Sequence, residues 1–284
     1  MLIADSGAHC DQRPAVRGSS DSGQGGALLM SNNRELVKLL QANVGSKRLS
    51  QVFDDFVEMS ALAFRNTVDL RGRDAREEQY LRVADQYDGE ALDRFGQALA
   101  LVILEVEREP GDVLGHLYMD LALGNEHMGQ FFTPYDVARM IAAMNAEGLA
   151  QQVTEHGFAQ LYEPACGAGA FIVAASQAMR ETGLNPQQQL HVTAEDLSST
   201  AVHMVYIHLT LLHIPAVVHH RNTLTQETHD SWFTPAHIFG GWAAKVRLQA
   251  TTGAALRLLK GEMPDEAFSD ADAALQSDES RRSA

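Results

Sequence analysis

The stretch "LYEPACGAGAFIVAASQ", Leu161 to Gln177, decides the fold of this chain. Leu161 and Tyr162 end a short β-type segment, the turn from Glu163 to Gly169 contains two glycines spaced Gly-x-Gly, and small and apolar residues at helical spacing follow. A strand that passes through a glycine turn into a helix is typical of the ligand-binding turn in parallel α/β sheets. We therefore expect this turn to hold a ligand, with a tight turn that binds nothing as the alternative.

The chemistry of the turn favours a ligand with a positive group. Dinucleotide-binding turns carry a third glycine and offer helix amides to a pyrophosphate, but Ile172 stands at that third position here. Glu163, at the mouth of the turn, would repel phosphate and attract an ammonium group. Gly167 and Gly169 let the backbone approach such a ligand closely.

Strand-like and helical segments alternate in the second half of the chain. We expect strands at residues 160–162, 191–194 and 216–219, and helices at 170–180 and 200–212. This alternation predicts a parallel sheet with crossover helices, in which ligands bind at the carboxyl ends of the strands.

The second expected strand ends in "AEDLSS", residues 194–199. An acid at the tip of this strand accepts both hydroxyls of a ribose in nucleotide-binding folds. Asp196 is preferred over Glu195 because strand alternation turns the two side chains to opposite faces, and Ser198 to Thr200 then cap the following helix. An acid for an amine, a glycine turn and an acid for a ribose together favour S-adenosylmethionine over a nicotinamide cofactor.

The first half of the chain has a helical pattern. Apolar residues recur at helical spacing from Asn33 onwards, and Asp88 is expected to cap one of the helices. We divide the chain into a disordered N-terminus (1–29), a helical N-terminal domain (30–125), an α/β domain (126–260) and an acidic disordered tail (261–284).

Composition narrows the function. The chain has 284 residues and a formal net charge of −15, which indicates that any contact with DNA is local or is shared with a partner. No apolar run reaches the roughly 20 residues of a membrane helix and no secretory signal is found, so we expect a cytoplasmic protein. Only Cys10 and Cys166 occur, and the histidines lack metal-ligand spacing, which argues against a disulfide framework and a metal site.

Three ordered motifs resemble the adenine-specific N-6 DNA methyltransferases, specifically the modification subunits of type I restriction-modification systems. They are "GQFFTPYDVARMIAAM" (Gly129 to Met144), "EPACGAGAF" (Glu163 to Phe171) and "AEDLSSTAVHMVYIHLTLLHI" (Ala194 to Ile214). The resemblance covers roughly residues 112–224. It implies a Rossmann-like, S-adenosylmethionine-dependent methyltransferase fold preceded by an all-helical domain. It also implies DNA as the substrate and a specificity or restriction subunit as a partner, in an oligomer of unknown size. The few residues between Asn222 and the acidic tail predict that the parallel sheet is truncated relative to the family.

The resemblance also implies which residues hold S-adenosylmethionine. In the family, a Phe-Thr-Pro turn lies against the methionine part, the glycine turn surrounds it, and an acid binds the ribose with an apolar residue beside the adenine. By matching motifs, these roles fall to Phe132, Thr133, Pro134, Glu163, Cys166, Gly167, Gly169, Phe171, Asp196 and Leu197, and Asn222 stands where the family often has an acid that reaches the adenine.

The first motif also reads as the start of a helix. Thr133 is expected to cap a helix from Pro134 to Met144, with Asp136 as the capping-box acid. Four apolar residues recur on this helix at i, i+3, i+4 and i+7 and are expected to face the core: Val137, Met140, Ile141 and Met144.

The chain departs from the family at the catalytic motif. Such enzymes carry Asn or Asp, then Pro-Pro, then Tyr or Phe after the fourth strand, where polar groups accept from the target amine and the ring stacks on the flipped base. This chain contains no Pro-Pro. At the expected place, "SWFTPAHIFGGW" (Ser231 to Trp242) offers Thr234, Pro235 and His237 as a variant loop, so the catalytic residues stay unassigned.

Two functions follow from this departure. One is a DNA adenine methyltransferase that works with a partner. The other is a cofactor-binding, catalytically silent relative that acts as a partner, regulator or decoy of a restriction-modification complex.

The expected sheet also stops near its first strand, and its open edge must be covered by the helical domain or by a partner subunit. Residues 245–259 are expected to form one helix, or a strand and a helix.

Overall fold

The computed structural model describes residues 22–121 and 132–260, without the side chains of 22–31 and 253–260. Residues 1–21 and 261–284 lie outside the described residues, so the disorder expected there stays a prediction. The first helix begins at Ser22. The disordered N-terminus therefore does not extend to residue 29 as expected.

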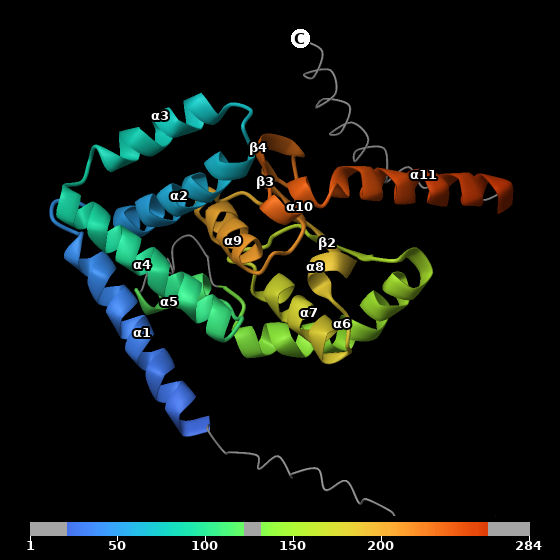
Figure 1. Ribbon diagram of the computed structural model, residues 1–284, viewed down its shortest axis with the longest axis horizontal. Helices are drawn as coiled ribbons and strands as arrows, with labels where there is room; N and C mark the ends of the chain where they lie inside the picture. Colours follow the sequence, from blue (N-terminus) through green and yellow to red (C-terminus); the bar gives the residue numbers. More distant parts are fainter. Residues whose placement is uncertain (1–21, 122–131, 261–284) are drawn as a thin grey trace, which may run out of the picture.

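Helices form the described N-terminal region (Figure 1): α1 Ser22–Ala42, α2 Leu49–Val68, α3 Arg73–Ala84, α4 Gly89–Arg108 and α5 Val113–Asp120. Asp88 accepts a hydrogen bond from the Ala91 N–H at 2.8 Å, which confirms the expected cap of α4. Phe53, Phe56 and Val102, all part of the expected helical pattern, are buried in the core. The all-helical region is confirmed as far as Asp120.

The second region is a sheet crossed by helices. Its elements are α6 Tyr135–His156, β1 Ala159–Glu163, α7 Ala170–Glu181, α8 Pro186–Gln189, β2 Leu190–Asp196, α9 Ser199–Leu211, β3 Ala216–Asn222, β4 Glu227–Phe233, α10 Pro235–Phe239 and α11 Trp242–Lys260. Strands β1, β2 and β3 are parallel neighbours, which confirms the expected parallel sheet. The sequence did not reveal β4, which pairs antiparallel with β3. Residues 245–259 form one helix, part of α11.

Helix α6 differs from the expectation at both ends and on its buried face. It extends to His156, Pro134 is its N-cap residue, and no side chain caps it, so the roles given to Thr133 and Asp136 are wrong. The four apolar residues expected in the core are exposed: Val137 40%, Met140 59%, Ile141 39% and Met144 78%. The small residues Ala138 and Ala142 are buried instead, together with Leu149 and Val153. The buried face of α6 is thus a narrow one, and alanines let α7 pack closely against it.

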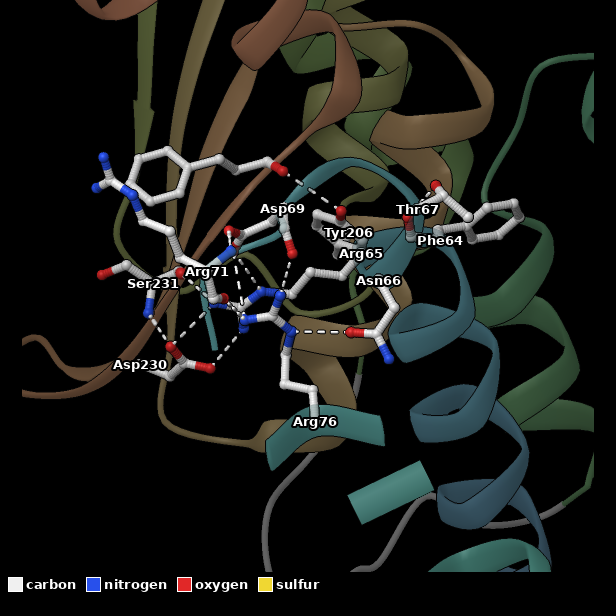
Figure 2. A network of polar contacts seen from close by, with 11 residues as sticks. Phe64, Arg65, Asn66, Thr67, Asp69, Arg71, Arg76, Tyr206, Asp230 and Ser231 are labelled. Carbon is white, nitrogen blue, oxygen red and sulfur yellow. Dashed lines mark hydrogen bonds and ion pairs between the residues drawn. The ribbon is translucent and has the colours of Figure 1, made fainter. Parts of the chain in front are cut away.

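A polar junction joins the helical region to the sheet (Figure 2). Helix α2 packs against α9, and Arg65 at its end donates to Asp230 Oδ2 at 2.7 Å and to the Ser231 carbonyl at 3.0 Å. The Arg65 guanidinium also lies 4.4 Å from the centre of the Trp232 ring. Arg65 is buried, so these contacts fix the helical region beside β4.

The opposite edge of the sheet is β1. The Gln160 N–H, which points away from β2, donates to Gln152 Oε1 of α6 at 3.0 Å, and the Gln160 side chain donates to Gln249 of α11 at 2.8 Å. The expectation that the helical domain covers this edge is wrong, because Arg65 holds that domain beside Asp230 on the other edge. In the part of the chain that the structure describes, no helix is both long and apolar enough to cross a membrane.

Candidate cofactor site

The glycine turn lies at the carboxyl edge of the sheet, between β1 and α7. Its backbone is tied to the end of β2: the Cys166 N–H donates to the Glu195 carbonyl at 2.9 Å, and the Gly167 N–H donates to Asp196 Oδ2 at 2.9 Å. The Ser198 N–H donates to the other oxygen, Asp196 Oδ1, at 2.9 Å. Asp196 therefore joins the glycine turn to the start of α9, and each of its oxygens keeps a lone pair for a ligand.

Both glycines are required by backbone conformation and by protein neighbours. Gly167 has φ +53°, and a Cβ there would lie 2.8 Å from the Phe132 ring. Gly169 has φ +92°, and a Cβ there would lie 2.7 Å from Val205 of α9. The expected role of these glycines was room for a ligand. In the structure, the space beside Gly167 is filled by Phe132 and the space beside Gly169 by Val205. Both glycines have a left-handed backbone conformation, which residues with a Cβ disfavour.

Two carboxylates meet at this turn without a cation. Burial raises the pKa of Glu163, and repulsion by Asp196 raises it further. Neither Glu163 nor Asp196 forms an ion pair with another residue in the described part of the chain. The buried Cys166 thiol lies in the same environment, and its pKa is raised by burial first and by the two carboxylates second. The site therefore has uncompensated negative charge that fits an ammonium group and hydroxyl donors.

Glu195, the alternative acid for the ribose, has protein partners that include a cation. It is 2% exposed, pairs with Arg221 at 3.0 Å and accepts a hydrogen bond from the Thr223 hydroxyl at 3.0 Å. The same hydroxyl lies 2.7 Å from the Pro164 carbonyl and shares its one hydrogen between the two acceptors, so Glu195 and Thr223 together hold the loop after β3 against the glycine turn. Arg221 and Thr223 were not singled out from the sequence. The register between β2 and β3, which pairs Glu195 with His219, puts Arg221 on the same face as Glu195, and alternation within each strand does not give that register.

Two further expected residues lie at the same edge. The Leu197 side chain is 61% exposed, and the carbonyl of this residue lies 3.0 Å from His220 Nε2. Asn222 Oδ1 accepts hydrogen bonds from the Leu224 and Thr225 amides at 3.0 and 3.2 Å. The Asn222 oxygen expected as an acceptor for the adenine thus organises its own turn.

The first motif reaches the turn through its aromatic ring. Phe132 lies on Gly167 and packs edge-on against Tyr118 of α5, with ring centres 5.0 Å apart. Thr133 and Pro134 are exposed. Phe171, the last residue of the second motif, is half-buried against the core. The structure therefore brings the three motifs together at one edge, although they are separated by about 30 residues each in the sequence.

The proposed variant catalytic loop lies at the other end of the sheet. Thr234 is fully buried, and its hydroxyl donates to the Ile214 carbonyl and accepts from the Ala216 N–H, both at 2.9 Å. Ala216 begins β3, whose last residue, Asn222, lies at the carboxyl edge. Asp196, which accepts from the Gly167 amide, pairs with His220, four residues beyond Ala216, so at about 3.3 Å per residue Thr234 lies roughly 13 Å along the strands from the level of the glycine turn. The interpretation of Thr234, Pro235 and His237 as a catalytic loop is therefore wrong.

His237 has a structural partner at that end. Its Nδ1 lies 3.0 Å from His191 Nε2, and the His191 ring stacks on Trp242 with centres 5.7 Å apart. Burial lowers the pKa of His191 to about 3 and that of His237 to about 4. Within residues 22–121 and 132–260, no three His, Cys, Asp or Glu side chains are grouped as metal ligands.

The fold and the site define the class first. A glycine turn between parallel strands, tied to an acid at the tip of the next strand, on a sheet preceded by helices, is the Rossmann-like methyltransferase fold. Residues 110–239 match the family model described as N-6 DNA Methylase.

Two solved structures are similar at low identity. One is a putative class I S-adenosylmethionine-dependent methyltransferase from Listeria monocytogenes, with 11% identity and a TM-score of 0.36 over 68% of this chain and 54% of that one. The other is a type I restriction-modification system methyltransferase subunit from Streptococcus thermophilus, with 22% identity and a TM-score of 0.34 over 63% of this chain and 41% of that one. The chain thus spans about half the length of these structures. No curated protein matches.

Proposed function

We propose that the chain binds S-adenosylmethionine at the carboxyl edge of its sheet and takes part in adenine N-6 methylation of DNA, as a cytoplasmic component of a restriction-modification complex. The observation that supports this most is the pair of carboxylates, Glu163 and Asp196, without a cation beside the glycine turn. A dinucleotide or a free phosphate would be repelled there, whereas an ammonium group and a ribose would be attracted.

Each residue of the site is proposed to bind a different part of the cofactor. Glu163 accepts from the ammonium group, Asp196 accepts from the ribose hydroxyls, and Leu197 offers an exposed apolar side chain to the adenine. Phe132 packs its ring against the turn at Gly167. When bound, the cofactor supplies an electrophilic methyl group. These roles rest on the matched motifs and on the charges around the turn.

By itself the chain transfers this methyl group slowly. Methyl transfer to an amine needs polar groups that hold the amine nitrogen and accept its developing charge, and the loss of one such group typically costs about 10²- to 10³-fold in rate. The only candidates offered by the sequence, Thr234 and His237, are buried at the opposite end of the sheet. A partner such as a specificity or restriction subunit would then complete the site and bind the DNA.

The placement of Thr234 also favours a second function. A chain that binds the cofactor but has no acceptor for the target amine fits a silent partner, regulator or decoy of a restriction-modification complex. The two functions differ in one measurement: tritium transfer from labelled S-adenosylmethionine to unmethylated DNA. We expect background incorporation with the purified chain. Incorporation that appears when restriction-modification partners are added supports the enzyme, and continued background supports the silent relative.

Cofactor binding itself is tested by calorimetry with S-adenosylhomocysteine, the demethylated product. Asp196→Ala removes charge-assisted hydrogen bonds of about 1.5 to 3 kcal/mol each, so we expect the affinity to fall at least tenfold. Asp196→Asn, which keeps the shape and one acceptor for the turn, should fall less. Asp93→Ala, at an exposed position of α4, is the matched control and should bind like the wild type. A folded wild-type chain that releases no heat with this ligand would contradict the proposal.

A further inference from the structure

His208 of α9 makes two contacts that the proposed cofactor chemistry does not use. It is fully buried, its Nδ1 lies 2.8 Å from the Ala168 carbonyl, and its Nε2 lies 3.2 Å from the Leu114 amide. Ala168 is the residue between the two glycines of the turn. Leu114 lies in the first turn of α5, where backbone amides have no partner within the helix. One imidazole ring thus joins the glycine turn to the helical region.

The two contacts fix the protonation of the ring. A carbonyl oxygen only accepts, so His208 Nδ1 must carry the hydrogen, and a backbone amide only donates, so Nε2 must be free of one. A charged ring would direct a second N–H at the Leu114 amide. Burial, which lowers the pKa of His208, disfavours the charged ring as well. His208 is therefore the neutral Nδ1–H tautomer.

The Ala168 carbonyl is a sensitive point of the turn. The flanking glycines can adopt many backbone conformations, and the hydrogen bonds around them select the one that is observed. Asp196 fixes the Gly167 amide on one side of Ala168, and the Cys166 carbonyl accepts from the Gly169 amide on the other. The hydrogen bond from His208 fixes the peptide group between them, and it comes from a helix that also contacts α5.

We propose that His208 is a positioning residue, which holds the glycine turn in the conformation that binds the cofactor and ties that conformation to helix α5. This proposal deepens the proposed function and rests on it for the identity of the ligand. It predicts that cofactor affinity depends on the contact to Ala168 and that the contact to Leu114 contributes chiefly to stability.

Two substitutions separate the contacts. The side-chain nitrogen of Asn can replace Nδ1, so His208→Asn keeps a donor for Ala168 and loses the acceptor for Leu114. The side-chain oxygen of Gln can replace Nε2, so His208→Gln keeps the acceptor for Leu114 and loses the donor for Ala168. His203→Gln is the matched control, because His203 is buried on the same helix but packs against Trp232, away from the turn.

The first measurement needs no cofactor. Hydrogen exchange of the wild type and the three variants, resolved by peptides, reports residues 163–173 and 112–121 separately. We expect His208→Gln to speed exchange in 163–173 and His208→Asn to speed it in 112–121, while His203→Gln changes neither selectively. Equal exchange of the two peptides in both His208 variants would overturn the link, since a merely space-filling histidine predicts no such selectivity.

The second measurement is the affinity for S-adenosylhomocysteine by calorimetry, on variants shown to be folded by circular dichroism. We expect about a tenfold loss for His208→Gln, and changes within about threefold for His208→Asn and His203→Gln. Equal losses for Asn and Gln would overturn the positioning role. A wild type that binds nothing would contradict the proposed function instead, and the exchange pattern would still decide whether His208 holds the turn.

Discussion

The two ends of the sheet treat buried polar groups in opposite ways. At the amino end, Thr234, His191 and His237 satisfy one another and the nearby backbone, and none of them carries a charge. At the carboxyl end, Glu163 and Asp196 keep negative charge close together without a cation. The neutral cluster at the amino end stabilises the chain. Among the described residues, the two carboxylates at the carboxyl end are left without a positive partner, which a ligand can supply. This contrast separates a structural cluster from a binding site more clearly than residue types do.

The largest expected effect tests the amino end through pH. The pKa values of His191, about 3, and His237, about 4, lie below the ordinary value of about 6.5, so the unfolded chain takes up protons first as the pH falls. The stability of this pair is fully present above about pH 6.5 and is lost towards pH 4 to 3. Between pH 7.5 and pH 5 we expect a loss of about 2 to 4 kcal/mol, measured by urea unfolding. The double variant H191Q/H237Q should lose much of this pH dependence, and an unchanged dependence would contradict the assignment.

Thr234→Val should have the next largest effect. Valine has a similar shape but leaves the Ala216 amide and the Ile214 carbonyl without their partner, which costs about 1 to 3 kcal/mol of unfolding free energy. Because Thr234 lies at the end away from the glycine turn, affinity for S-adenosylhomocysteine should stay within about twofold of the wild type. Thermal unfolding and calorimetry on the same preparation measure both quantities. A large loss of affinity at unchanged stability would restore Thr234 to the binding site.

The smallest expected effect on stability is that of Glu163→Gln, at the carboxyl end of the sheet. The pKa of Glu163 is raised, so the folded chain binds its proton more readily than the unfolded chain, and this carboxyl group costs stability as the pH rises above about 4.5. Since the group is only half-buried, Glu163→Gln should raise stability at pH 7 by less than about 1 kcal/mol. The same change should weaken cofactor binding by about fivefold, because the ammonium group loses its carboxylate. Lower stability together with tighter binding would reverse both signs and refute the interpretation.

How much the sequence reveals differs between the two ends. The strands around the glycine turn are predicted within a few residues because glycines and apolar runs are local signals, as for β2, expected at 191–194 and found at Leu190–Asp196. The amino end was misjudged because "SWFTP" looks like a loop motif. β4 pairs antiparallel with β3, so the end of β4, which precedes Thr234, lies beside the start of β3. This pairing joins residues that are distant in the sequence, and no local pattern reveals it.

Helix α6 shows the same limit for burial. Its apolar residues, Met140 and Met144 among them, recur at the spacing of a core-facing stripe, yet the side that packs against α7 is the one with Ala138 and Ala142. Periodicity identifies a helix correctly but cannot say which of two apolar faces a neighbour covers. Likewise, the role of His208 depends on residues about 40 and 94 positions away in the chain, for which one sequence holds no local signal.

The glutamines around β1 have a consequence for how the chain behaves at high concentration. An edge strand is a template on which other chains add strands, and such growth ends in aggregates. Gln152 occupies the outward amide of Gln160, and Gln249 holds the Gln160 side chain beside it, so a foreign strand must first displace both. These two glutamines therefore oppose the addition of a foreign strand to β1.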